Sequence, residues 1–315
     1  MSSSTAGPGH QVHVVGLESV TVGFECDGAS DGRPLMLLHG FPDAVATWDG
    51  VVGDLLRHDP GLRIVRPYIR GHGPTVVHEG LPITAETSAL AQDVVQLADH
   101  LGINRFHLVG SDWGCRAAYA LAGLWPDRVR SMVTVGTGYN EATPITDLSM
   151  PQVSSFWYQW LFNTPHGEEL LRARTTEFCR HLWRVWSPSW SFSDAEFEAA
   201  ATAFANPQFV DTVLHYYRYR WGGAPAAGRY VETQRHVESM PDITVPTTHI
   251  QGGADFCTRP ETASQFEGRI SAPYHRVDLP GIGHFPQREV PVEVAAVIRR
   301  AIARVDFADG DGSFE

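Results

Sequence analysis

A glycine-framed turn constrains the fold of this chain more than any other segment. The residues Gly-Ser-Asp-Trp-Gly at 110–114 directly follow an apolar run at 106–109 and precede a segment with helical periodicity. The two glycines let the backbone turn back sharply from a strand into a helix, which pushes the central side chain out at the end of the strand. That central residue is Asp112. The sequence therefore predicts a strand, a tight turn and a helix, with a carboxylate at the apex of the turn.

The residue type at this apex indicates a class of chemistry. A serine at such a turn needs a base before it can attack an acyl carbon. A carboxylate is already ionised at neutral pH and displaces leaving groups from saturated carbon, forming an alkyl ester. Asp112 therefore favours epoxide opening or halide loss over ester hydrolysis. The alternative is structural, because an aspartate after a strand often caps the following helix.

Short apolar runs alternate with helix-like segments on both sides of the turn. Continuous apolar runs are typical of strands that are buried on both faces. Their alternation with helices predicts an α/β fold, with a mostly parallel sheet flanked by helices. The predicted strands are 12–16, 20–25, 34–38, 63–69, 106–109, 129–135, 247–252 and 274–279, and the predicted helices are 47–58, 84–101, 113–124, 261–268 and 290–305.

The alternation is interrupted between residues 138 and 240. This stretch is helical in character and holds six of the nine tryptophans, at positions 157, 160, 183, 186, 190 and 221. We predict a helical cap domain at 138–240, inserted into a core domain formed by 10–137 and 241–306. The terminal segments 1–9 and 307–315 are rich in small or acidic residues and are predicted to be flexible tails.

Composition excludes several classes of function. The formal net charge of −12 disfavours a nucleic-acid partner and favours a small-molecule substrate. The four cysteines form no CxxC pair, so we expect no metal and no cofactor. The N-terminus lacks a secretory pattern, and no apolar stretch is long enough to span a bilayer. We expect a cytoplasmic monomer or homodimer without membrane contact.

The motifs around the turn resemble the α/β-hydrolase fold, and within it the epoxide hydrolases, over residues 12 to 305. His-Gly-Phe-Pro at 39–42 is similar to the loop that supplies an oxyanion hole in this family. By that resemblance, the backbone N–H groups of Phe41 and Trp113 form the hole. Ser111 departs from the family pattern, which usually has histidine before the nucleophile.

The resemblance also implies the partners of the nucleophile. His284 lies in Gly-Ile-Gly-His-Phe-Pro at 281–286, where the fold places its catalytic base. It implies that a neutral imidazole activates the water that hydrolyses the ester on Asp112. Asp255, in the loop after the strand 247–252, matches the acid that orients the imidazole. Glu141 is the alternative acid, because some dehalogenases place it after the strand 129–135.

Two segments of the insertion resemble the lid tyrosines of epoxide hydrolases. They are Phe-Trp-Tyr-Gln at 156–159 and His-Tyr-Tyr-Arg at 215–218. The resemblance implies that Tyr158 and Tyr217 donate protons to the epoxide oxygen as general acids. Packing within an aromatic lid is the alternative role of these tyrosines. If the register of the second segment is shifted, Tyr216 or Tyr219 takes the place of Tyr217 as the acid. The side chains expected to contact substrate are those of Phe41, Trp113, Trp157 and Phe285.

Three functions are compatible with these residues. The preferred one is conversion of a hydrophobic epoxide and water to a vicinal diol. The second is a haloalkane or haloacid dehalogenase, but haloalkane dehalogenases commonly have asparagine where this chain has Phe41. Fluoroacetate dehalogenases pair two arginines after the nucleophile, whereas here Trp113 replaces the first and only Arg116 remains. The third is a ligand-binding protein on the same fold that has lost catalysis.

Overall fold

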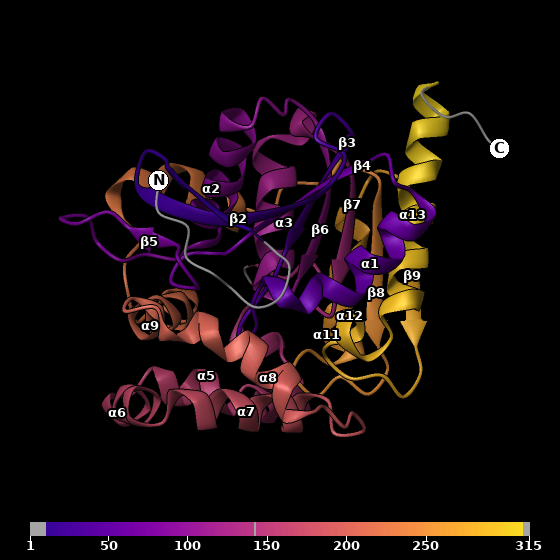
Figure 1. The fold of residues 1–315 in the computed structure, drawn as a ribbon. Coiled ribbons are helices and arrows are strands. Elements are labelled where there is room, and N and C mark those ends of the chain that lie inside the picture. The colour runs from indigo at the N-terminus through magenta and orange to yellow at the C-terminus, as the bar shows by residue number, and fades with distance from the viewer. Residues whose placement is uncertain (1–10, 142, 311–315) are drawn as a thin grey trace.

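The computed structural model describes residues 11–141 and 143–310, and within them one nine-stranded sheet organises the fold (Figure 1). The strand order is β1-β2-β4-β3-β6-β7-β8-β9, with the short β5 paired to β2. From β4 to β9 neighbouring strands are parallel, and β2 pairs antiparallel with its neighbours. The bounds are β1 Val12–Gly16, β2 Val20–Gly28, β3 Arg33–Leu38, β4 Leu62–Pro67, β5 Val76–Val77, β6 Phe106–Ser111, β7 Val129–Val135, β8 Thr247–Gly252 and β9 Tyr274–Leu279.

Burial along the strands follows their position in the sheet. Every residue of the central strands β6 and β8 is buried, as expected for parallel strands covered on both faces. The edge strand β9 is only partly buried. Because the central parallel strands run in one direction, their carboxyl ends meet at one edge of the sheet. Asp112, Asp255 and His284 all follow such ends.

Helices cover both faces of this sheet. The helices α2 (Thr87–His100) and α3 (Trp113–Leu124) pack together on one face, and α1 (Asp49–His58) and α13 (Pro291–Asp309) on the other. On α13 the buried side chains Val294, Ile298 and Ile302 recur at intervals of four residues. This spacing places them along one side of the helix, against the sheet. Two short helices, α11 (Pro260–Ala263) and α12 (Pro286–Glu289), follow β8 and β9.

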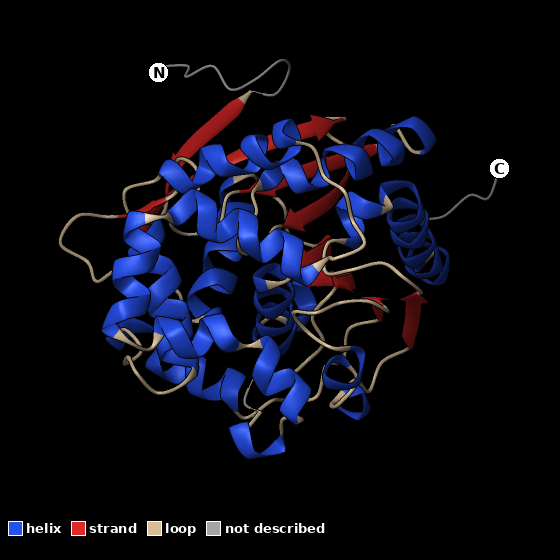
Figure 2. Cartoon of the chain, turned by 90° about the horizontal axis from the view of Figure 1, so that it is seen from below, coloured by secondary structure: helices blue, strands red, loops and turns tan. Residues whose placement is uncertain are grey.

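The insertion between β7 and β8 is helical, as predicted. Its helices between residues 157 and 220 lie below the carboxyl ends of the strands, whereas its last helix packs against α2 and α3 (Figure 1). In Figure 2, which views the molecule from below, helices lie in front of the strands. Ser149, Thr164 and Ser193 cap three of these helices by accepting backbone N–H groups. The helices are α4 Met150–Ser155, α5 Trp157–Phe162, α6 Pro165–Ala173, α7 Thr175–Trp186, α8 Asp194–Ala201, α9 Phe209–Arg220 and α10 Val231–Glu238.

Several boundaries differ from the sequence-based expectations. The predicted helix 261–268 shrinks to α11 and a 3₁₀ turn, and the two-residue β5 was not predicted. Residues 307–309, predicted to belong to a flexible tail, are instead the last part of α13. The buried Asp306 explains this, because its carboxylate binds Arg33 and lies 3.2 Å from the imidazole Nε2 of His107. The predicted tails 1–9 and 311–315 lie outside the described residues.

No helix within the described ranges 11–141 and 143–310 has the length and apolar character needed to cross a bilayer.

Candidate active site

The turn after β6 has the geometry that the sequence predicts. Asp112 has φ 52° and ψ −113°, a region that a non-glycine residue rarely adopts. Close packing of the backbone leaves no room for a side chain at the two glycines. A Cβ on Gly110 would lie 2.2 Å from the carbonyl oxygen of Gly114. A Cβ on Gly114 would lie 2.3 Å from the carbonyl oxygen of Leu38. The side chain of Asp112 makes no capping hydrogen bond with α3, which removes the structural alternative.

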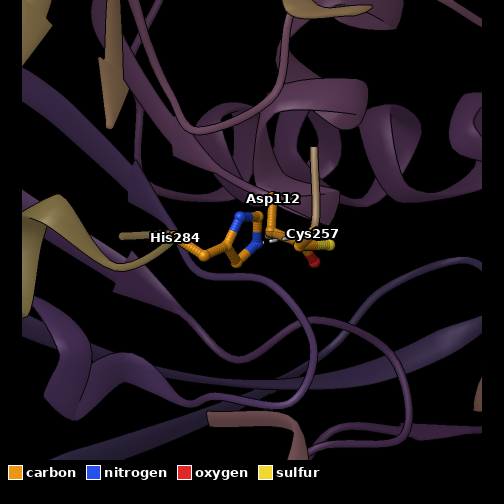
Figure 3. A group of neighbouring side chains, drawn as sticks. All are labelled: Asp112, Cys257 and His284. Atoms are coloured by element: carbon orange, nitrogen blue, oxygen red, sulfur yellow. Dashed lines mark ion pairs between the residues drawn. The ribbon is translucent and has the colours of Figure 1, made fainter. Parts of the chain in front are cut away.

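Asp112 faces His284 and Asp255 across the carboxyl ends of the sheet. The imidazole Nε2 of His284 lies 3.4 Å from Oδ2 of Asp112, and Nδ1 lies 2.8 Å from Oδ2 of Asp255 (Figure 3 draws the first pair). The other oxygen of Asp255 accepts backbone N–H groups from Cys257 and Thr258 at 2.7 and 3.0 Å. These bonds fix the carboxylate, which in turn fixes the ring of His284.

A contact with the cap holds the loop that carries His284. The backbone N–H of His284 donates to Oγ of Ser187, the residue that follows α7, at 2.8 Å. Ser187 Oγ also donates to the carboxylate of Glu289 at 2.8 Å. Glu289 accepts the N–H of Gly283 at 2.9 Å as well. The position of the imidazole therefore depends on the cap as well as on the core.

Burial and charge determine the protonation of this pair. Burial raises the pKa of Asp255, and the imidazole of His284 opposes that rise. Burial alone would lower the pKa of His284, but the carboxylates of Asp255 and Asp112 hold it well above its ordinary value. The imidazole is thus favoured as a cation while both carboxylates are charged.

The two predicted oxyanion-hole residues both adjoin Asp112. The backbone N–H of Phe41 donates to Oδ1 of Asp112 at 2.9 Å. Trp113 is the first residue of α3, where backbone N–H groups have no partner within the helix. The rings of Phe41 and Trp113 stack with centroids 5.5 Å apart.

Two buried phenols of the cap face Asp112. The hydroxyl of Tyr217 accepts the indole N–H of Trp113 at 3.0 Å, and that of Tyr158 accepts the side-chain amide of Gln159 at 2.8 Å. Accepting an N–H does not use the hydroxyl proton of either phenol. The hydroxyl of Tyr158 also lies 3.6 Å from Sγ of Cys257. Burial raises the pKa of Tyr158 and of Tyr217 well above the ordinary value for tyrosine, so both stay protonated at neutral pH.

The amide of Gln159 is itself oriented by a neighbour. Its oxygen accepts the indole N–H of Trp221 at 2.9 Å, so its nitrogen must face the phenol of Tyr158. Gln159 therefore positions Tyr158.

Asp112 and the phenols border a small cavity of about 10 Å³ between the cap and the core. Three buried polar atoms of its lining have no hydrogen-bond partner among the described residues, namely Thr137 Oγ1, Tyr216 OH and Arg220 Nε. Buried polar groups are normally paired, so such a cluster indicates where a ligand binds. The cavity is lined by Asp112, Trp113, Arg116, Thr137, Phe156, Tyr158, Gln159, Tyr216, Tyr217, Arg220, Cys257 and Thr258.

Comparisons with known proteins agree with this arrangement. The sequence model of the α/β hydrolase fold family matches residues 33–290. The chain belongs to this family.

Within that family this α/β hydrolase groups with the epoxide hydrolases, which confirms the predicted resemblance and the predicted fold. A Klebsiella pneumoniae crystal structure provisionally named an epoxide hydrolase is 33% identical, with a TM-score of 0.85 over 92% of this chain and 96% of the other. Epoxide hydrolase 3 of Xenopus tropicalis is 27% identical over 275 residues, which are 85% of this chain and 71% of the relative. A fluoroacetate dehalogenase from a Burkholderia species is 35% identical over 129 residues, 40% of this chain and 41% of the relative.

Some of the residues predicted for the site of this α/β hydrolase lie elsewhere. Trp157 does not line the cavity and is 37% exposed, because one residue along α5 is a rotation of about 100° away from Tyr158. The ring of Phe285 packs against those of Trp183 and Trp190 instead. The ring of Phe41 lies in the aromatic core, and only its backbone N–H reaches Asp112.

The alternative residues considered for the acid roles also differ in position. Glu141 binds the hydroxyl of Thr87 at 2.6 Å and lies 3.5 Å from Arg116, so Asp255 alone of the two acids contacts His284. The hydroxyl of Tyr219 binds Glu238 on the outside of α9. Tyr216 does line the cavity, where its ring stacks on Trp113 with centroids 3.8 Å apart.

Sequence reasoning did not identify Gln159, Cys257 and Arg220. Arg220 lies three residues after Tyr217 on α9, a spacing that places two side chains on one side of a helix. The spacing from Tyr217 could therefore have identified Arg220 as a residue of the site. Cys257 follows Asp255 by two residues in a loop, and a loop gives no periodicity from which its direction can be read.

Asp112, Cys257 and His284 also form a group that is suited to a soft metal ion. One ligand atom from each lies within 4.8 Å of the others (Figure 3). Thiolate, imidazole and carboxylate are the ligands that zinc prefers. Binding of an ion there would occupy both Asp112 and the imidazole.

Proposed function

We propose that this protein hydrolyses an epoxide to a vicinal diol through an alkyl ester on Asp112. The observation that carries the proposal is the convergence of two protonated phenols on a carboxylate that is paired with a histidine. Ring opening needs a nucleophile on one side of the epoxide and a proton donor on the other. The relatives named as epoxide hydrolases support the same reaction class.

The first step forms the ester. Oδ1 of Asp112 is held by the N–H of Phe41, so Oδ2 is the oxygen that attacks the ring carbon. The bond between that carbon and the epoxide oxygen breaks as the new C–O bond forms. Tyr217 or Tyr158 donates its proton to the departing oxygen, which becomes the first hydroxyl of the product.

The second step hydrolyses the ester. Esterification removes the charge of Asp112, which had helped to raise the pKa of His284, so the imidazole loses its proton more readily. The neutral ring then removes a proton from water, and the water oxygen attacks the carboxyl carbon of Asp112. The N–H of Phe41 stabilises the charge that develops on Oδ1. The imidazolium returns this proton to Oδ2 as the bond between the carboxyl carbon and Oδ2 breaks, which releases the diol and leaves the solvent oxygen on Asp112. The carboxyl group gives up the remaining proton of that water, which restores the phenol.

Two observations favour an epoxide over a haloalkane. A halide needs N–H donors beside the leaving group, and the indole N–H of Trp113 already donates to Tyr217. A departing epoxide oxygen needs a proton, and the two phenols supply it. The phenols of Tyr158 and Tyr217 therefore favour ring opening over halide loss.

We expect Tyr217→Phe to slow ester formation from styrene oxide roughly 10-fold, and Tyr158→Phe/Tyr217→Phe to slow it roughly 1,000-fold. One phenol still protonates the leaving oxygen after the single change, whereas the double change removes both donors. Rapid-mixing kinetics of the burst phase measures the step directly.

The matched control is Tyr219→Phe on the same helix, which removes a hydroxyl bound to Glu238 and should leave the burst unchanged. Chloroalkanes are tested in parallel for halide release. Unaltered epoxide opening in the double variant, together with rapid release of chloride by the wild type, would establish a dehalogenase instead.

A further inference from the structure

The carboxyl-terminal end of the cap helix α7 contacts further loops of the active site besides the loop that carries His284. The indole N–H of Trp183 donates to the carbonyl oxygen of Pro42 at 2.7 Å, in the loop that supplies the predicted oxyanion hole. The carbonyl oxygen of Trp186 accepts the backbone N–H of Phe256 at 3.2 Å, in the loop after β8 that carries the acid. One end of one cap helix therefore holds core loops that lie far apart in the sequence.

Ser187, which follows α7 directly, holds the histidine loop. Its side chain is fully buried. Its one hydroxyl proton goes to Glu289, so its lone pairs can accept the backbone N–H of His284. Glu289 also accepts the N–H groups of Gly283 at 2.9 Å and Phe285 at 3.2 Å. One serine and one carboxylate therefore fix three successive backbone N–H groups, those of residues 283, 284 and 285.

Close packing leaves the histidine loop little room to move. A Cβ on Gly283 would lie 2.2 Å from Oγ of Ser187. The ring of Trp186 meets that of His284 edge to face, with centroids 5.0 Å apart. The imidazole is therefore held through its backbone, through its ring, and through the bond from Nδ1 to Asp255.

The two steps of the reaction depend on this position to different degrees. Ester formation uses the carboxylate of Asp112 and a phenol, and in the described part of the chain Ser187 makes no hydrogen bond to Asp112, Tyr158 or Tyr217. Ester hydrolysis needs Nε2 of His284 within reach of a water that attacks the carboxyl carbon. A misplacement of about 1 Å at such a group costs roughly 100-fold in rate.

We propose that Ser187 is a positioning residue for His284 and that it serves hydrolysis of the ester, not its formation. This inference rests on the proposed function and assigns a residue of the cap to its second step. Ser187 belongs to the cap, and Glu289 and His284 belong to the core. The rate of hydrolysis therefore depends on how the end of α7 sits on the core.

The test measures the two steps separately in Ser187→Ala. We expect the burst of ester formation from styrene oxide to stay within about twofold of the wild type, and ester hydrolysis to slow roughly 10- to 100-fold. The ester should then accumulate during turnover, and rapid quenching followed by intact-mass spectrometry measures its fraction. Glu289→Gln, which disturbs the same bonds from the core side, should slow the same step.

Ser193→Ala is the matched control. Ser193 is also a serine of the cap whose hydroxyl donates to a glutamate and accepts a backbone N–H, both from Glu196, but it is exposed at the start of α8. Its replacement should leave both steps unchanged. Circular dichroism and the melting temperature check that each variant is folded.

A second measurement does not depend on the reaction. The proton that Nδ1 of His284 shares with Asp255 should give a downfield proton NMR signal, which is assigned by its absence in His284→Gln. We expect this signal to shift or broaden in Ser187→Ala and to stay unchanged in Ser193→Ala. An unchanged signal in folded Ser187→Ala, or an equal loss of rate in both steps, would overturn the positioning role.

The two proposals fail in different ways. If the wild type forms the ester and Ser187→Ala hydrolyses it at the wild-type rate, the positioning role is wrong and epoxide hydrolysis stands. If the wild type opens no epoxide but the NMR signal changes in Ser187→Ala, the reaction is wrong and the effect of Ser187 on His284 stands.

Discussion

We expect His284→Gln to stop the reaction at the covalent ester and to lower steady-state turnover roughly 1,000-fold or more. Nothing in the first step requires the imidazole, because Asp112 is the nucleophile and a phenol supplies the proton. Glutamine cannot take a proton from water, so the ester accumulates. Intact-mass spectrometry after mixing with styrene oxide should show one added epoxide per protein molecule.

The control is the double variant Asp112→Ala/His284→Gln, which should gain no mass under the same conditions. Peptide mapping places the adduct within the tryptic peptide that holds Asp112. The thiol of Cys257 lies beside Asp112 and His284. An adduct on Cys257 would show that this thiol, and not Asp112, is the nucleophile.

The second large effect concerns the nucleophile itself. We expect Asp112→Ala to lower kcat/KM roughly 10,000-fold or more, with no burst, because among the described residues that line the cavity no other carries a carboxylate. Any remaining turnover would have to come from binding of the substrate and from proton donation by the phenols.

Asp112→Asn is the matched control for shape. It retains an oxygen that can accept the N–H of Phe41, but it lacks the negative charge that attacks carbon and pairs with His284. Both variants should be inactive while they keep the fold, checked by circular dichroism. Activity of Asp112→Asn near that of the wild type would mean that water attacks the epoxide directly.

The sequence predicts those parts of the molecule that depend on local chemistry. The glycines at 110 and 114 predict the turn, because no larger side chain fits there. Buried apolar runs predict the central strands. The resemblance to epoxide hydrolases implies the register of Tyr158 and Tyr217 in the cap. It also implies the roles of His284 and Asp255, which both follow strand ends of the same sheet.

The sequence does not predict features that depend on contacts between distant segments. The helix α13 extends to residue 309 because Asp306 binds Arg33 and His107, which lie far away in the chain. Trp157 looked like a substrate contact by composition, but the rotation of α5 turns it outward while Tyr158 turns inward. The sequence also does not show that Arg220 forms no ion pair with another described residue, since that depends on where Glu86, Glu141 and Glu238 bind. The size and polarity of the cavity arise only when the cap meets the core.

A single turnover in water enriched in oxygen-18, with enzyme in excess over epoxide, tests the central claim most directly. Because Oδ2 of Asp112 becomes the new hydroxyl oxygen, the first diol should carry no label from the solvent. The label should appear instead on the carboxyl group of Asp112, and in the diol only after further turnovers. Solvent label in the first diol, with none on Asp112, would contradict the covalent ester.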